Sequence, residues 1–196
     1  MLMTEELALV AMNPLRKGPG LGSGRQLNAC LAGLLLGDLV LEGMAALHPK
    51  DTIVLVPGAS PDAGTLAGAA SVVAGKGPKI KTVLSDMDRG LRKYAGQGTW
   101  DAVVSGLPEG AAGRDEVIER LRAAAASDEQ IDPRTALILS MTGPAQLLEL
   151  VAPRQGADRR HARNRIDHAT DGSPYEAISR AVRKLIAQDQ AAAAAV

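Results

Sequence analysis

The residues from Lys17 to Arg25 have the composition of a loop that could hold a phosphate group. They read Lys-Gly-Pro-Gly-Leu-Gly-Ser-Gly-Arg and stand directly before a long apolar stretch. Glycines can expose backbone N–H groups, and the N-terminus of a helix favours an anion. However, the segment follows a predicted helix rather than a strand, Pro19 removes a donor, and no Gly-Lys-Ser/Thr closes the loop. A flexible connector is therefore favoured over a nucleotide site, and a weak headgroup contact through Arg25 stays open.

Side chains of the catalytic types are scattered rather than grouped. His161 and His168 are seven residues apart and flanked by arginines, whose charge disfavours a bound cation. No serine lies in a nucleophile motif such as Gly-x-Ser-x-Gly, and the acidic pairs stand at ordinary positions of surface helices. We expect no metal site and no cofactor, and an enzyme is the least favoured class of function.

The charge of the whole chain is balanced, with 22 Lys and Arg against 22 Asp and Glu. The protein therefore has no general attraction for nucleic acid or anionic lipid. Aromatic residues make up only 2% of the chain and offer few platforms for base stacking, so no nucleic-acid partner is expected. Attraction to an anionic surface must come from a local patch.

One basic region lies late in the chain, between Leu150 and Leu185. Its basic residues are Arg154, Arg159, Arg160, Arg163, Arg165, Arg180, Arg183 and Lys184, and its acidic residues are Asp158, Asp167, Asp171 and Glu176. Eight positive charges less four negative ones leave a local charge of +4. An anionic lipid surface yields about 1 kcal/mol per well-placed Lys or Arg. A solvated face paired with its own carboxylates is the slightly favoured alternative.

The stretch from Leu27 to Leu41 predicts a helix buried on most of its faces, because nearly every residue is apolar or small and no proline interrupts it. Ala29, Gly33 and Gly37 recur every four residues, so they should line one side and let another helix pack closely. The stretch is shorter than the ~20 residues needed to span a bilayer, and it contains Asp38.

The single cysteine, Cys30, falls inside this stretch. A buried free thiol without a disulfide partner fits a reducing compartment. The chain starts Met-Leu-Met-Thr-Glu-Glu-Leu, with acid where a secretory signal peptide needs basic residues. We expect a soluble cytoplasmic protein that can attach to the inner face of the membrane. The Ala and Gly content suggests a bacterial source.

Local signals predict further helices and one hairpin. Thr4 should cap a first helix that ends near Met12, and Gly43 should end the central helix. Strands at 44–47 and 52–56 flank the turn His-Pro-Lys-Asp. Asp132 before Pro133 is a good helix start.

The predicted fold is mainly α, a compact single-domain helical bundle around the buried central helix with one small β-hairpin. The later helices are expected at about 62–74, 78–94, 99–107, 114–126, 133–142, 144–151, 157–168 and 174–190. One domain should cover residues 1–190, and residues 191–196 should form a disordered Ala-rich tail.

Several of these segments together resemble the Golgi phosphoprotein 3-like family. The central stretch carries the pattern L-x-x-C-L-A-G-x-L-L-x-D-L-x-L-x-G behind an acidic first helix. Residues Pro57 to Asp62 look like the P-x-x-x-x-D joint of the family, and Asp132 to Thr135 look like its D-P-R-T helix start. The resemblance runs from about Thr4 to about Ile186. It implies a mostly helical single domain, no enzyme activity and peripheral binding to membranes that bear phosphoinositides.

The resemblance also shows departures from the family pattern. Members that bind phosphatidylinositol 4-phosphate use a Trp just before the central helix, an Arg inside it and two Arg from a later helix. Alignment on the central pattern places Ser23 and Ala32 at the first two positions and no basic residue near the later pair, at Trp100 to Ala102. The segment from Leu107 to Arg114 is too short for the hairpin with which family members often meet the membrane or sister subunits. The headgroup pocket of the family is therefore not present as written.

Four basic residues are candidates for a substitute anion site. Arg25 stands at the start of the central helix, whose N-terminus carries about half a positive charge, and Arg89, Arg92 and Lys93 lie on the helix that the resemblance places nearby. The predicted function is a non-catalytic, peripheral adaptor that binds phosphoinositide or other anionic lipid headgroups. The alternative is a soluble module that binds a protein or small-molecule partner and has lost lipid binding. The oligomeric state stays open.

Overall fold

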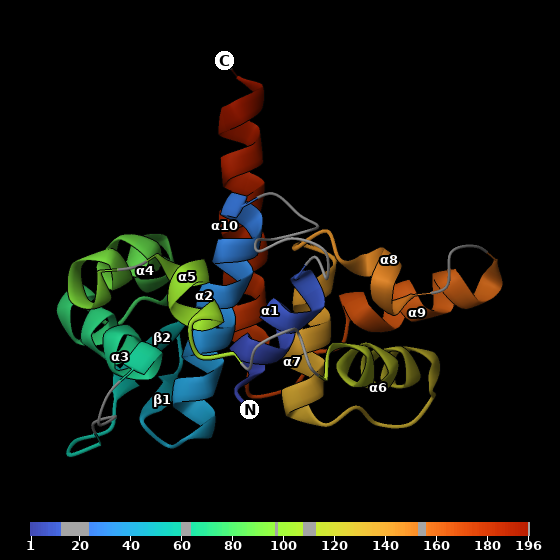
Figure 1. The fold of residues 1–196 in the computed structure, drawn as a ribbon, viewed down its shortest axis with the longest axis horizontal. Helices are drawn as coiled ribbons and strands as arrows, with labels where there is room; N and C mark the ends of the chain where they lie inside the picture. Colours follow the sequence, from blue (N-terminus) through green and yellow to red (C-terminus); the bar gives the residue numbers. More distant parts are fainter. Residues whose placement is uncertain (13–23, 60–63, 97, 108–112, 153–155, 196) are drawn as a thin grey trace.

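The computed structural model describes residues 1–12, 24–59, 64–96, 98–107, 113–152 and 156–195. Within these ranges the chain is mainly α, as the sequence predicts, and it contains a two-stranded antiparallel hairpin (Figure 1). The elements in chain order are α1 (Met3–Ala11), α2 (Gly24–Leu41), β1 (Ala45–His48), β2 (Thr52–Leu55), α3 (Gly64–Lys76), α4 (Ile80–Ala95), α5 (Thr99–Val104), α6 (Arg114–Ala126), α7 (Pro133–Thr142), α8 (Leu148–Val151), α9 (Ala157–Asp167) and α10 (Glu176–Ala194).

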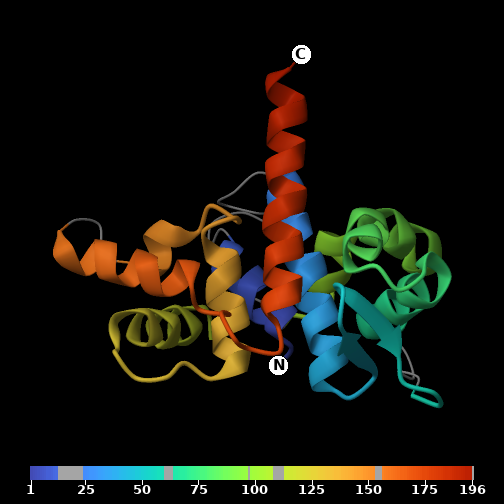
Figure 2. The ribbon, with the colours of Figure 1, turned by 180° about the vertical axis from the view of Figure 1, so that it is seen from behind.

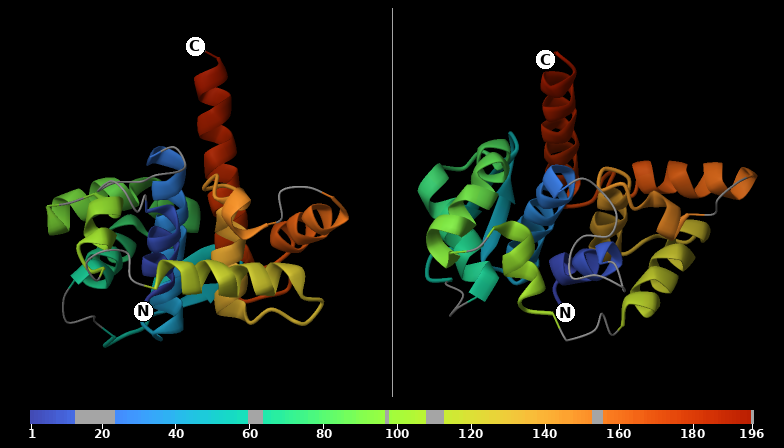
Figure 3. Two further views of the ribbon diagram at one scale, coloured as in Figure 1. Left: turned by 45° about the vertical axis from the view of Figure 1, so that its right-hand side comes forward. Right: turned by 45° about the horizontal axis from the view of Figure 1, so that its top comes forward.

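The helices α2 and α10 form the centre of the molecule. They lie side by side and run in opposite directions, and α1 and α7 also pack against α2 (Figures 1 and 2). The hairpin, α3, α4 and α5 lie on one side of this centre, whereas α6, α8 and α9 lie on the other (Figure 3). Because α2 meets elements from several directions, every residue from Cys30 to Leu39 is buried.

Close packing around α2 depends on its small residues. A Cβ at Gly33 would lie 2.6 Å from Cγ2 of Val182 on α10, and a Cβ at Gly37 would lie 2.5 Å from Cδ2 of Leu137 on α7. The predicted close approach is therefore present at both glycines, but they face two different helices rather than the single one that the four-residue spacing predicted. Ala29 is half-buried and packs at the margin of the core.

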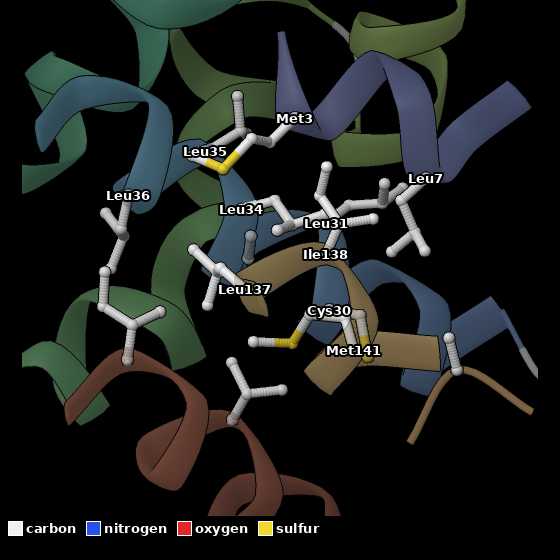
Figure 4. Packing of buried hydrophobic residues seen from close by; sticks show 14 of the residues in the cluster. Met3, Leu7, Cys30, Leu31, Leu34, Leu35, Leu36, Leu137, Ile138 and Met141 are labelled. Atoms are coloured by element: carbon white, nitrogen blue, oxygen red, sulfur yellow. The ribbon is translucent and has the colours of Figure 1, made fainter. Parts of the chain in front are cut away.

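Large aliphatic and sulfur-containing side chains fill the space between these helices. Figure 4 shows Cys30 and Leu34 of α2 together with Leu137 and Met141 of α7 in this core. Cys30 is buried and free, as predicted, and burial raises the pKa of its thiol far above the ordinary value. The thiolate is the reactive form of cysteine, so this thiol is inert in the folded protein.

The start of α1 differs from the prediction. The helix begins at Met3 with Leu2 as its N-cap residue, so the prediction that Thr4 is the N-cap is wrong. The backbone N–H groups of Met3 and Thr4 instead donate to Oδ1 and Oδ2 of Asp38 on α2, at 2.8 and 3.1 Å, and the Thr4 hydroxyl also donates to Asp38. Asp38 thus satisfies, from a second helix, the N–H groups that a cap side chain would satisfy. Eight of the nine residues of α1 are buried.

The predicted hairpin is present, and a third segment extends it. Ala46 pairs with Val54 and His48 pairs with Thr52 between β1 and β2. On the other edge of β2, Thr52 forms an antiparallel bridge with Lys79, just before α4 begins. The hairpin is therefore attached to both α2 and the α3–α4 pair.

Local signals set several boundaries where they were predicted. Asp132 Oδ1 accepts a hydrogen bond from the Thr135 N–H at 3.0 Å, and Gly43 leaves α2 with a φ of 69°. The helix predicted at 144–151 is shorter, because Gln146 has a left-handed φ of 62° and a turn precedes α8. In the segment predicted as a disordered tail, α10 continues to Ala194, and alanine has the highest helix propensity.

Candidate anion-binding site

A pocket of about 210 Å³ lies between the C-terminal half of α3 and α4. Its lining residues are Ser71, Val72, Gly75, Lys76, Arg89, Gly90 and Lys93. Three of them are cationic, and they come from two different helices. Two of the four predicted candidates, Arg89 and Lys93, therefore line one pocket, together with Lys76, which the sequence did not single out.

The pocket exists because α3 and α4 pack at very short range. A Cβ at Gly90 would overlap Cγ2 of Val72, and a Cβ at Gly68 would lie 2.7 Å from Cδ2 of Leu91. Glycine on each helix thus lets the backbones approach, so the longer side chains that flank the contact converge at its edge. Lys76 and Lys93 stand in the last turns of their helices, where a cation also complements the helix dipole.

Asp86 of α4 is the acidic partner of these cations. Its side chain is only 12% exposed and pairs with Lys76, with 3.4 Å between Nζ and Oδ2, and with Arg89. The carboxylate therefore holds a lysine of α3 and an arginine of α4 over the same opening. Counting Lys93, three positive charges against one negative charge leave a net charge of +2 for this group.

Arg92 lies away from this pocket. Its Nε donates to Asp88 Oδ2 at 3.1 Å, and its guanidinium covers Gly98, where a Cβ would lie 2.7 Å from Nη2. Burial raises the pKa of Asp88, but the hydrogen bonds from the Thr99 N–H, at 2.8 Å, and from Arg92 outweigh this effect and lower it. The pair of Arg92 and Asp88 therefore fastens the end of α4 to the start of α5.

Arg25 contributes to a different surface. It lies in the first turn of α2 with 85% of its side chain exposed, and its Nε is 3.9 Å from Oδ2 of Asp189 on α10. Arg25 is not among the residues that line the α3–α4 pocket. The Gly-rich segment before it, including Ser23, falls outside the described residues, as do most of the positions between Leu107 and Arg114.

Two other positions compared with the family pattern lie within the described ranges. Ala32 is 2% exposed in the core of α2, so this position faces packed side chains rather than a headgroup. On α5, Ala102 is buried and Trp100 is half-buried against the core. The structure therefore gives these positions a packing role.

Most arginines of the late basic region have partners, some within the region and some on other elements. Arg159 pairs with Glu149, Arg163 lies 3.9 Å from Asp167, and Arg180 pairs with both Asp51 and Glu176. Arg183 donates to the Asp167 carbonyl at 2.8 Å and so closes the end of α9. Arg154 lies outside the described residues. These contacts favour the interpretation of a solvated face whose arginines are largely occupied by carboxylates and backbone carbonyls.

A wider groove of about 600 Å³ lies between the α6–α7 connection and α9. Asp128, Glu129 and Asp171 line it, with Arg165 and His168, so its charge does not suit an anion. Within the described part of the chain, no three His, Cys, Asp or Glu side chains are grouped as metal ligands. The helices in the same ranges are all too short or too polar to cross a bilayer.

Lys76 is the pocket residue that sequence reasoning missed. The predicted helix ended at residue 74, which left Lys76 in a connection, whereas α3 continues to Lys76, and this residue lines the pocket. A helix–helix contact marked by Gly68 and Gly90 is the signal that could have pointed to this lysine.

The sequence of this chain matches a known protein family. The search of curated proteins gives no match to this chain. The family profile described as Golgi phosphoprotein 3 (GPP34) matches residues 3–188. This family consists of non-enzymatic adaptors that in general bind phosphoinositide lipids and proteins. Because the match covers nearly the whole chain, the chain belongs to the Golgi phosphoprotein 3 (GPP34) family.

Proposed function

We propose that this chain is a non-catalytic adaptor that attaches peripherally to an anionic membrane, at its cytoplasmic face. The α3–α4 pocket is the primary contact for a lipid headgroup, through Lys76, Arg89 and Lys93. Arg92 and Arg25 add weaker, more distant attraction. The observation that carries the proposal is the convergence of three cations from two helices on one pocket, in a chain whose family binds phosphoinositides.

The chemistry of the pocket suits a phosphate group. An arginine offers a planar fork of N–H donors to phosphate oxygens, and a lysine adds a mobile point charge. Asp86 competes for two of these cations, and the described residues of the lining include no aromatic side chain that could stack on a sugar ring. We therefore expect weak binding that selects poorly among anionic headgroups.

Co-sedimentation with lipid vesicles tests this proposal. The variant Arg89→Ala with Lys93→Ala removes two charges from exposed positions of α4. Each well-placed cation near an anionic surface is worth about 1 kcal/mol, so the variant should lose about tenfold or more in affinity for vesicles that contain anionic lipid. The matched control is Arg160→Ala with Arg163→Ala, which removes the same charge from exposed positions of α9.

The expected result is a loss in the α4 variant and little change in the α9 variant. An equal loss in both would show that only net charge matters and would refute the pocket. If the unmodified chain bound vesicles of neutral lipid only, and the α4 variant bound them equally well, the ligand would not be an anionic headgroup.

A second candidate function is a soluble module that binds a protein or small molecule. The groove of about 600 Å³ beside α9 favours it, because this groove is wider than the basic pocket and lies in another part of the structure. The sedimentation experiment separates the two candidates, since this one predicts no vesicle binding by the unmodified chain.

A further inference from the structure

The outer face of the β-hairpin has basic side chains at its turn end and apolar side chains at its other end. Paired residues in an antiparallel ladder point to the same face of the sheet. Thr52 pairs with His48 on one side and with Lys79 on the other, so these three side chains share a face. Two residues further along β2, Val54 shares this face with Ala46. The opposite face carries Ala45 and Ile53, which are buried against the body of the protein.

The apolar end of this face is exposed. Among the described residues, the large hydrophobic side chains with substantial exposure are Met1, Leu41, Val54 and Val56. Val54 and Val56 alternate along one face of the chain, and Leu41 lies nearby in sequence, three residues before Met44, whose carbonyl accepts a hydrogen bond from the Val56 N–H. Their exposed fractions are 47% for Leu41, 38% for Val54 and 37% for Val56. Exposed apolar side chains that gather in one place mark an interaction surface more often than single ones do.

The other end of the face is cationic. Lys50 stands in the hairpin turn, and Lys79 donates from Nζ to the Lys50 carbonyl at 3.1 Å, so both lysines lie at the same end. The carboxylate in this turn, Asp51, is held by Arg180 of α10 at Oδ1 and Nη2, 2.6 Å apart. Glu42, exposed next to Leu41, places an acidic residue at the apolar end.

Charge decides which partner this face fits. Lys50 and Lys79 give the turn end of this face a positive charge. An anionic lipid surface attracts the same lysines, and its acyl-chain boundary accepts small apolar side chains. The chain between Lys76 and Lys79 spans three residues, on the order of 10 Å at most, so the face adjoins the α3–α4 pocket.

We propose that the outer face of this hairpin is a membrane-docking surface, with Val54, Val56 and Leu41 at the acyl-chain boundary and Lys50 and Lys79 against the headgroups of an anionic bilayer. Figure 2 shows the hairpin beside the lower part of α10, where α2 ends. This inference rests on the proposed function, because it assigns the bilayer contact of the same peripheral attachment.

A fluorescent probe on the hairpin tests the inference directly. In a Val54→Cys variant a thiol-reactive label should attach to residue 54 only. Cys30 is fully buried and burial raises its pKa, so its thiol does not react. An environment-sensitive label at residue 54 should shift to the blue and brighten on vesicles with anionic lipid, and quenchers on the acyl chains should reduce its emission. The control is Ala123→Cys with the same label, at an exposed position of α6 on the other side of the molecule (Figure 1).

A second variant needs no label. Val54→Ser with Val56→Ser changes two positions that are 38% and 37% exposed. The fold should persist with a modest fall in the thermal midpoint, while the vesicle partition coefficient falls by about threefold or more. Vesicle binding without a spectral shift at residue 54 would overturn the hairpin assignment and leave the pocket standing. No sedimentation of the unmodified chain would overturn both proposals. A concentration-dependent dimer that the serine variant abolishes would overturn the lipid assignment in favour of a second copy.

Discussion

The carboxylate of Asp38, on α2, accepts a hydrogen bond from the backbone N–H of Thr4, on α1, across 34 residues of sequence at 3.1 Å. Asp38 is fully buried, and three hydrogen bonds to Met3 and Thr4 meet its two oxygens. Arg134 of α7 also lowers the pKa of this carboxyl, but burial outweighs these effects and raises the pKa to about 6. The Asp38 side chain therefore joins α1 to α2, and removing its carboxylate from water lowers the stability that these hydrogen bonds provide.

This relationship predicts how stability depends on pH. The pKa of Asp38 is raised from 3.8 to about 6 in the folded state, so its contribution is fully present below 3.8 and is lost as the pH rises through about 6. By linkage, Asp38 should contribute about 1 kcal/mol more to the free energy of unfolding at pH 5 than at pH 7. In an Asp38→Asn variant this increase should disappear. Urea unfolding followed by the fluorescence of Trp100, the single tryptophan, measures it.

Other carboxylates make the free energy of unfolding change with pH in the opposite direction. The effect of Asp38 is therefore the difference between the pH profiles of the unmodified chain and the Asp38→Asn variant. Burial raises the pKa of Asp132, but its hydrogen bonds to Thr135 outweigh this and lower it, and that stability is lost as the pH falls. Such groups are common to both proteins and cancel in the difference. Parallel pH profiles for the unmodified chain and the Asn variant would refute the assignment to Asp38.

Side chains added at Gly33 should destabilise the core. A Cβ there would meet Val182 at 2.6 Å and both Ile178 and Met141 at 3.5 Å. Gly33→Leu should lower the free energy of unfolding by about 1–3 kcal/mol or more through overpacking. Gly24→Ala on the same helix is the control, because a Cβ there has nothing within 4 Å. A melting temperature for Gly33→Leu equal to that of the control would refute the close-packing argument.

Glu6 should contribute more to the free energy of unfolding than Glu119, an exposed glutamate that also pairs with an arginine. Its side chain is 9% exposed, and it pairs with Arg120 and with Arg134, where Nη2 lies 2.9 Å from Oε1. Glu6→Gln leaves these arginines without their charge partner, and we expect a loss of about 1–3 kcal/mol because both arginines keep some contact with water. Glu119→Gln breaks an exposed pair with Arg122 and should cost below about 0.5 kcal/mol. Chemical denaturation of both variants measures the two losses in the free energy of unfolding, and equal losses would contradict a special role of Glu6.

Vesicle binding should be sensitive to salt and insensitive to the identity of the headgroup. The Debye length falls from about 10 Å at 0.1 M to about 3 Å at 1 M ionic strength, so attraction between exposed cations and lipid weakens steeply. Co-sedimentation across a salt series, with phosphatidylserine compared with phosphatidylinositol 4-phosphate, measures both properties. Tight, salt-resistant selection of phosphatidylinositol 4-phosphate would show a selective pocket built from other residues.

Arg25 and Arg92 should contribute less to membrane binding than Arg89 and Lys93. Both lie outside the α3–α4 pocket and pair with Asp189 and Asp88. Arg25→Ala with Arg92→Ala should therefore reduce vesicle affinity by less than about fivefold, the effect of roughly one fully placed cation. The comparison pair is Arg159→Ala with Arg163→Ala. If only that pair weakens binding, the late helices are the membrane face and the placement is wrong.

The elements whose ends are set by local chemistry could be predicted from the sequence. Asp132 with Pro133 fixed the start of α7, and Gly43 fixed the end of α2. Both signals act within one turn of the chain, so no knowledge of the tertiary structure is needed. Gln146 shows the limit, because nothing in its neighbours demands the left-handed conformation that it adopts.

The functional features that depend on contacts between distant segments could not be predicted in the same way. The cap of α1 comes from Asp38, so the local signal at Thr4 pointed to the wrong residue. Likewise, the α3–α4 pocket depends on the contact of Gly90 with Val72, which brings Lys76 beside Arg89. Arg92 is one turn from Arg89 in sequence but faces Asp88 and Gly98, a difference that residue type alone does not reveal.

The C-terminal end of α10 is helical because the first turns of the same helix pack against the core. Ile178 and Val182 are buried against the core, whereas the residues from Ala187 to Ala195 are all exposed and the helix projects beyond the body of the protein (Figure 3). Starting a helix is costly and extending it is cheap, so the docked turns act as the nucleus for the projecting ones. Amide hydrogens should therefore exchange with solvent faster at each successive turn toward Ala194, and the end of the helix frays from the tip while its base stays closed.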